Sequence, residues 1–211
     1  LFLDPYYYYP NNINTKVDKS EILKILPNGT IEVSELEEDI LLKNDGLTNI
    51  INEFPGDYNM AFASFCNWKS IYECDQLRQS FEIKNNFKYD AVMRIRPDWK
   101  IKENPVLKFF ELNDEITFYD SSISTDNNDV TLSVTDVCFV ANSDTMSLVT
   151  SLYPKLVNEV KEKKWKKYNF ASPNHQKYLI GESALYWHLK NLHIKFNKIP
   201  QPNYGFIYRL N

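Results

Sequence analysis

The chain has 211 residues, 43% of them hydrophobic and 15% aromatic, which suits one globular domain with a full-sized core and excludes a disordered chain. Its net charge of −4 gives no general attraction to nucleic acid, and it has no apolar run of about 18 residues, so we expect no transmembrane segment. The three cysteines have neither paired nor metal-ligand spacing, which predicts reduced thiols in a cytosol-like compartment.

Two further features of the sequence are the start of the chain and its low glycine content. The chain does not begin with methionine and opens on an apolar piece, so we expect a processed, truncated or partial segment of a longer protein. It has only five glycines and neither a GxGxxG nor a Walker A pattern. Any phosphate binding must therefore use side chains.

The first part of the chain is predicted to lead into one long helix. Residues 6–9 are four consecutive tyrosines, which either pack over a hydrophobic rim or stack on a base or a sugar. Residues 57–82 show the longest helical pattern, with a broad apolar stripe that should pack on a sheet. On this helix Trp68 and Lys69 are candidates to line a ligand cleft, although core packing is the alternative for Trp68. Asn85 and Asn86 end the helix.

The central strand carries the charged residues that suggest a site. Residues 89–95 form an apolar strand in which Arg94 shares a face with Arg96, because residues two apart on a strand point the same way. Pro97 cannot donate a ladder hydrogen bond, so the chain should leave the sheet there and project Asp98 from the carboxyl end of the strand. Ligands of open α/β sheets bind at that end.

These side chains suit a nucleoside diphosphate. Two guanidinium groups match phosphate oxygens, and the carboxylate of Asp98 matches a divalent cation that bridges those phosphates. The alternative is an internal ion-pair cluster that only closes the end of the strand, since structural ion pairs are common.

The second half of the chain is predicted to alternate strands with helices, which fits a mixed α/β sheet flanked by helices. The strands are expected at 115–119, 134–141 and 194–199, and helices at 143–156, with a kink at Pro154, and at 173–191. A polar loop at 120–129 resembles a lid in composition. The histidines lack metal-ligand spacing and are treated as ordinary.

One strand of this half contains a charged residue. Asp136 interrupts the apolar strand 134–141, and a carboxylate there is unfavourable without a partner. It therefore either pairs with an arginine such as Arg94 or serves a site.

Three segments together resemble a known family. The pattern YDxVxRxRPD at 89–98, the segment TDxCFVxNSDxM at 135–146 and the pattern GExxL at 181–185 are similar to GT-A-type glycosyltransferase domains, especially those tied to surface polysaccharides in bacteria and large algal viruses. The resemblance covers residues 59–199. It implies a single GT-A-like, Rossmann-like domain over residues 1–211, and a cytoplasmic protein, in the host cytoplasm if the chain is viral.

The resemblance also implies a reaction. A sugar would move from a nucleoside-diphosphate sugar, such as a UDP-sugar, to a hydroxyl of a glycan or polysaccharide acceptor. Such enzymes usually hold Mn²⁺ or Mg²⁺ with an Asp-x-Asp motif, but here Arg96 replaces the first aspartate and only Asp98 matches the second. We therefore expect one of three arrangements: a weakly bound metal, a metal shared with Asp136 or a C-terminal side chain, or neutralisation of the leaving diphosphate by Arg94 and Arg96 without a metal.

The other site residues follow from the same resemblance. Glu182 is the candidate base for the acceptor hydroxyl and Asp136 is its substitute. Trp68 and Lys69 join the arginines as candidate residues for donor binding. Two competing hypotheses remain: a non-catalytic nucleotide- or glycan-binding module with a degenerate site, and a structural domain whose Arg/Asp cluster is only an ion-pair plug.

Overall fold

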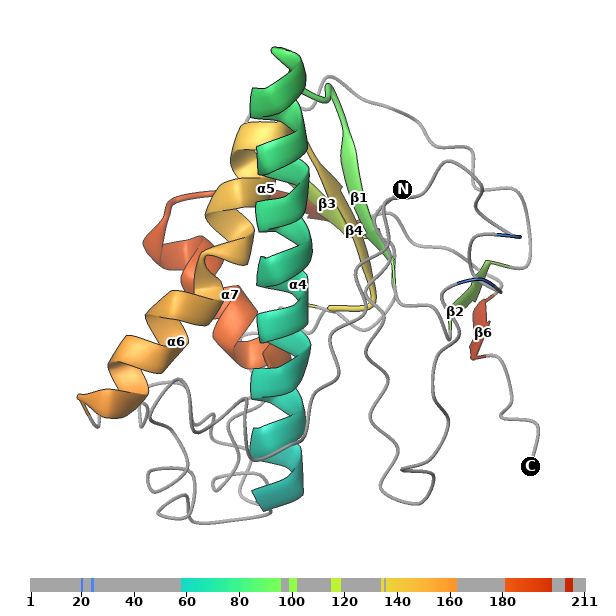
Figure 1. The fold of residues 1–211 in the computed structure, drawn as a ribbon. Coiled ribbons are helices and arrows are strands. Elements are labelled where there is room, and N and C mark those ends of the chain that lie inside the picture. Colours follow the sequence, from blue (N-terminus) through green and yellow to red (C-terminus); the bar gives the residue numbers. More distant parts are fainter. Residues whose placement is uncertain are drawn as a thin grey trace.

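The computed structural model describes residues 58–95, 99–101, 115–118, 134, 136–162, 181–198 and 204–206, together with Ser20 and Lys24 (Figure 1). The elements are α4 (Tyr58–Asn85), β1 (Val92–Ile95), β2 (Trp99–Ile101), β3 (Glu115–Phe118), β4 (Cys138–Ala141), α5 (Ser143–Thr150), α6 (Leu152–Lys161), α7 (Gly181–Asn191), β5 (Lys195–Lys198) and β6 (Tyr204–Phe206). Over these ranges the chain has the predicted α/β architecture, with the helices gathered on one face of a mixed sheet (Figure 1).

The four-stranded sheet has the order β1-β4-β3-β5, and β2 pairs separately with β6. β4 runs antiparallel to both β1 and β3, whereas β3 and β5 are parallel. Strands β1, β3 and β5 therefore point the same way, and their carboxyl ends lie at one edge of the sheet together with the start of β4. The register pairs Ile95 with Cys138, so the residues just before β4 lie at the end of β1.

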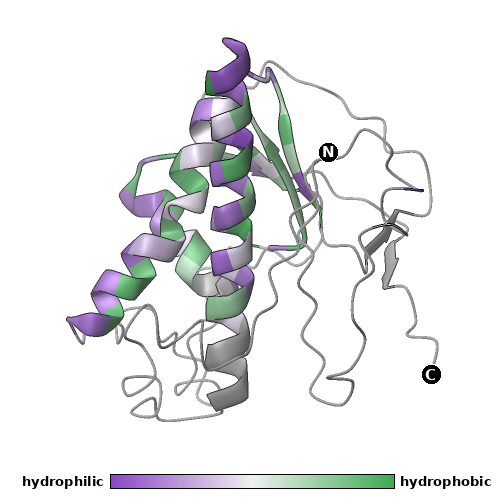
Figure 2. Ribbon diagram, in the orientation of Figure 1, coloured by the Kyte–Doolittle hydropathy of each residue, from purple (hydrophilic) through white to green (hydrophobic). Residues whose placement is uncertain are grey.

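The hydrophobic core lies between this sheet and the helices. Its largest fully buried apolar side chains are Trp68, Phe65, Phe118, Phe139, Ile116, Leu152 and Leu156. Figure 2 shows apolar residues along β1 and β4, while hydrophobic and hydrophilic residues alternate along α4. Burial of one such aliphatic or aromatic side chain stabilises the fold by about 1.5–3 kcal/mol.

Two helix boundaries have a local physical cause. The predicted single helix from 143 is instead two, α5 and α6, which meet at Ser151. Pro154 lies three residues later. A proline has no N–H to donate to the carbonyl four residues earlier, here that of Thr150, and its ring collides with that carbonyl. The break thus falls one turn before the expected kink.

The end of α4 at Asn85–Asn86 confirms the prediction. Asn86 has a positive φ of 52°, a left-handed conformation that asparagine tolerates better than most residues. Its N–H donates to the carbonyl of Ile83 at 3.3 Å, and the N–H of Phe87 donates to that of Glu82 at 3.1 Å. This is the Schellman pattern, and the Phe87 ring completes it by packing edge-on against Phe81 at 5.9 Å between centroids.

The inward face of α4 is only partly apolar, which differs from the predicted stripe. Phe65 and Trp68 are buried. Further along the helix the buried position is occupied by a charged side chain, that of Arg78, which is 1% exposed. Its Nε donates to Asp75 Oδ1 at 2.7 Å, and its Nη1 lies 2.8 Å from Glu82 Oε2. These residues form a buried ion network within α4.

The same network joins α4 to α5. Nη2 of Arg78 donates to Ser147 Oγ at 2.7 Å, and Ser143 Oγ donates to Glu82 Oε2 at 2.9 Å. Thr150 Oγ1 donates to Asp75 Oδ2 at 2.9 Å. Each of the three charged groups is thus hydrogen-bonded, as buried charges require.

His188 is buried where α7 meets α5. It is 1% exposed, and its Nε2 lies 2.9 Å from the carbonyl oxygen of Leu148. Burial lowers the pKa of His188 to about 4, because removing the ring from water disfavours its charged form. The ring is therefore neutral at pH 7, and its Nε2–H donates to Leu148.

We predict that this histidine makes stability fall with acidification. Between its ordinary pKa of 6.5 and about 4, the unfolded chain binds a proton that the folded chain does not. The free energy of unfolding therefore decreases as the pH falls through this window, by up to about 3 kcal/mol. Urea unfolding of wild type and His188→Gln, whose amide still reaches Leu148, should show that the variant lacks this component of the decrease.

The control for that experiment is His193→Asn. His193 is exposed and has a positive φ of 54°, which asparagine also accepts. This variant should keep the wild-type pH dependence. Equal losses in the wild type and in His188→Gln between pH 7 and pH 4 would contradict the assignment to His188.

Candidate functional site

Three of the predicted site residues lie on segments near the edge of the sheet where β1, β3 and β5 end. Arg94 is the next-to-last residue of β1, and Asp136 comes two residues before β4 at the same edge. The N–H of Val134 donates to the carbonyl of Glu182 at 3.3 Å, which joins the chain before β4 to the first turn of α7. Three of the residues selected from the sequence, Arg94, Asp136 and Glu182, are thus on segments that meet at one edge.

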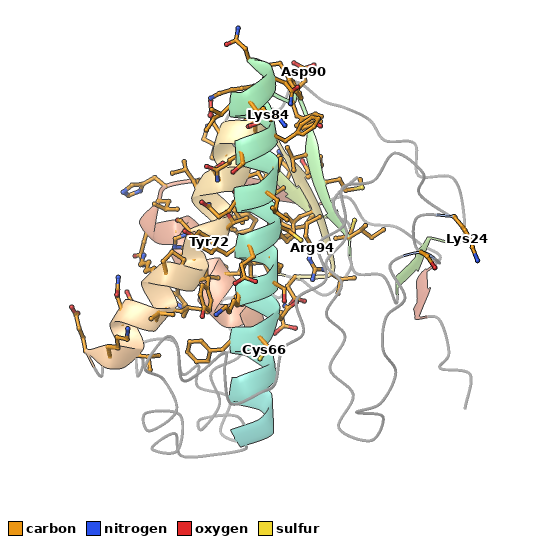
Figure 3. The ribbon with its side chains drawn as sticks, viewed as in Figure 1. Lys24, Cys66, Tyr72, Lys84, Asp90 and Arg94 are labelled. Carbon is orange, nitrogen blue, oxygen red and sulfur yellow. The ribbon has the colours of Figure 1, made fainter. Side chains whose placement is uncertain are left out.

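A side-chain cluster at this edge joins two of them through a third residue from α4. Arg94 Nη1 donates to the carbonyl of Val137 at 2.8 Å, and its Nη2 donates to Asn67 Oδ1 at 3.1 Å. Asn67 Nδ2 in turn donates to Asp136 Oδ2. We call Asn67, Arg94 and Asp136 the edge cluster; Figure 3 shows Arg94 beside α4.

The carboxylate of the edge cluster is held on one side only. Asp136 is 6% exposed, and its Oδ2 accepts the hydrogen bond from Asn67. Its Oδ1 is also buried and has no hydrogen-bond partner within the part of the chain that the structure describes. A buried carboxylate oxygen in this state suits a ligand that brings a donor, such as a hydroxyl group.

The chain was compared with family models, curated proteins and solved structures. No family model, no curated protein and no solved structure matches the chain. Among the described helices, none is both long and apolar enough to cross a membrane. The chemistry of the site is therefore inferred from the edge cluster itself.

Trp68 has the core-packing role that the sequence left as its alternative. The indole is fully buried, and a Cβ added to Gly181 would lie 3.0 Å from its Nε1. Gly181 thus allows the start of α7 to approach α4. Lys69 is 14% exposed at its side chain, with its Nζ 3.9 Å from Glu73 Oε1 and 5.9 Å from the centre of the Tyr153 ring. A role of Trp68 or Lys69 in donor binding stays a prediction.

Several predicted residues lie outside the described residues. These are Arg96, Asp98, the tyrosines at 6–9 and the polar loop at 120–129. Within the described ranges no group of three His, Cys, Asp or Glu side chains is arranged to hold a metal ion. The edge cluster contains a single carboxylate, that of Asp136, which is too few ligands for a metal ion. The Mn²⁺ or Mg²⁺ prediction therefore continues to depend on Asp98.

Sequence reasoning missed Asn67. The signal was present, because Asn67 is a polar residue next to Trp68 in a helix whose inward positions also include Phe65 and Ile71. A polar residue beside an apolar stripe has to find a partner when its helix packs on a sheet. The identity of that partner depends on tertiary packing, which the local pattern does not contain.

Proposed function

We propose that the chain is a nucleotide-sugar-dependent glycosyltransferase of GT-A type, which moves a sugar from a nucleoside-diphosphate donor to a hydroxyl of a glycan acceptor. The observation that carries the proposal is the edge cluster. It places a buried, oriented carboxylate, that of Asp136, at the edge of an α/β sheet where ligands bind. The resemblance of the segments at 89–98, 135–146 and 181–185 to GT-A domains supports the same assignment.

The reaction requires positive charge for the departing diphosphate. Negative charge builds on the phosphate oxygens as the bond to the sugar breaks, and fixed cationic groups lower the energy of that state. Both terminal nitrogens of Arg94 donate to protein groups, so Arg94 acts here through its charge and by ordering the edge cluster. Arg96, two residues further along the chain, is the proposed direct phosphate ligand.

The reaction also requires a base when the anomeric configuration inverts. The acceptor oxygen forms the new bond to the sugar carbon, the bond from that carbon to the diphosphate oxygen breaks, and the acceptor proton passes to a carboxylate. Of the two candidates, Asp136 is favoured over Glu182. Its Oδ2 is fixed by Asn67, while its Oδ1 has no partner among the described residues.

A second candidate function is a nucleotide- or glycan-binding module without catalysis. Arg96 favours it, because arginine stands where GT-A enzymes usually have the first aspartate of the metal motif. Both candidate functions need a donor or glycan site, whereas an ion-pair plug needs none. Binding therefore separates the first two from the third, and turnover separates the first from the second.

The proposal is tested by thermal-shift measurements with nucleoside diphosphates and their sugars, with and without Mn²⁺. Stabilisation by the nucleotides of one base supports a donor site. Release of the nucleoside diphosphate on addition of a glycan acceptor would then support the transferase. An absence of any shift at millimolar ligand counts against the transferase and against a nucleotide-binding module.

A further inference from the structure

The chemistry of its neighbours fixes the orientation of the Asn67 amide. A guanidinium group has only donors, so the Asn67 oxygen has to face Arg94, as it does at 3.1 Å from Nη2. The amide nitrogen then has to face Asp136, whose Oδ2 accepts from it. Asn67 is thus the neutral link in a chain of hydrogen bonds that runs from a cation to an anion.

This link has a consequence for Asp136. An arginine in direct contact with a carboxylate commonly binds both of its oxygens in parallel. Here Asn67 occupies the position between the two groups and takes only one oxygen, Oδ2. Arg94 donates instead to Asn67 and to the carbonyl of Val137. The second oxygen of Asp136 is therefore left for another donor.

We propose that Asn67 is a positioning residue: it keeps Arg94 from pairing directly with Asp136 and presents Oδ1 of Asp136 to the acceptor hydroxyl. This inference rests on the proposed transferase function. It extends that function by adding a residue from α4 that lies outside the three segments that resemble GT-A domains. Asn67 contacts no reacting atom itself, and its effect passes through the orientation and protonation of Asp136.

The main test variant is Asn67→Asp, which is nearly isosteric. The new carboxylate still accepts from Arg94, but it places a second anion beside Asp136 in place of an N–H donor. Two adjacent carboxylates share one proton, so the pair titrates at higher pH than a single carboxylate. The acid limb of the kcat profile should then move upward by about one pH unit or more.

A second variant, Asn67→Ala, removes the link without adding charge. Asp136 loses its orientation, and kcat should fall by about tenfold to a hundredfold, because small misplacements of a catalytic group have effects of that size. Binding of the nucleoside diphosphate alone should stay as in the wild type. Asn158→Asp on α6, where the side chain is exposed, is the matched control. It should leave kcat and its pH profile unchanged.

The outcomes distinguish failure of the transferase function from failure of the role of Asn67. A wild type that binds no nucleoside diphosphate and releases none overturns the transferase, and the role of Asn67 with it. A wild type that turns over while Asn67→Asp and Asn67→Ala keep its kcat and its pH profile overturns only the role of Asn67. Circular dichroism and urea unfolding of each variant identify any loss that comes from unfolding.

Discussion

Replacing Arg78 with methionine should lower the free energy of unfolding by about 3–5 kcal/mol. Arg78 is 1% exposed and binds Asp75 and Glu82, which are themselves buried. Methionine fills much of the same volume but leaves two carboxylates without their cation in the interior. Removal of one partner from a buried ion network is strongly destabilising, because the remaining charge is desolvated and has no opposite charge beside it.

Urea unfolding of Arg78→Met measures this loss, with Lys84→Met as the control. Lys84 is exposed in the last turn of the same helix, so its replacement should change stability by less than about 0.5 kcal/mol. Adding Asp75→Asn and Glu82→Gln to Arg78→Met should restore part of the loss, since the unpaired charges are then gone. A loss below about 1 kcal/mol in Arg78→Met would show that the network does not hold α4 to α5.

On the proposed transferase function, Asp136→Asn should reduce sugar transfer by about a hundredfold to ten-thousandfold in kcat, the range expected for a general base. The asparagine oxygen still accepts from Asn67, so the local structure should be kept. Its amide cannot take the acceptor proton, so the chemical step slows. The affinity for the donor should stay the same. Steady-state kinetics with separate kcat and KM values distinguishes these two effects.

The control for this variant is Asp144→Asn. Asp144 is 73% exposed at its side chain and lies in the first turn of α5, where it contacts Lys88. Its replacement should leave kcat unchanged. An Asp136→Asn protein with kcat within about threefold of the wild type would remove Asp136 as the base and return that role to Glu182.

The sequence predicted the features that depend on local chemistry. The end of α4 at Asn85–Asn86 follows from the tolerance of asparagine for positive φ, and β1 follows from the apolar run before Arg94. The α/β alternation with a mixed sheet was also predictable, because strand and helix periodicities differ. A direct pair with Arg94 was one of the two alternatives for Asp136, whereas the structure joins the two side chains through Asn67.

The sequence did not predict the features that depend on tertiary partners. The predicted apolar stripe of α4 did not include Asp75, Arg78 and Glu82, yet they are buried because α5 covers them with hydroxyl groups. His188 looked ordinary for the same reason, since its burial arises from the packing of α7 against α5. Such partners are distant in the chain, so no local window contains them.

The edge of the sheet beyond β1 is proposed to bind a nucleoside-diphosphate sugar, and a thermal-shift panel tests this binding directly. Nucleoside diphosphates of each base and their sugars would be added with and without Mn²⁺. A ligand at 100 times its dissociation constant should add about 2.7 kcal/mol of stability. We expect such a shift with the nucleotides of one base, and a smaller shift in Arg96→Met. A panel with no shift at millimolar ligand would contradict the donor site.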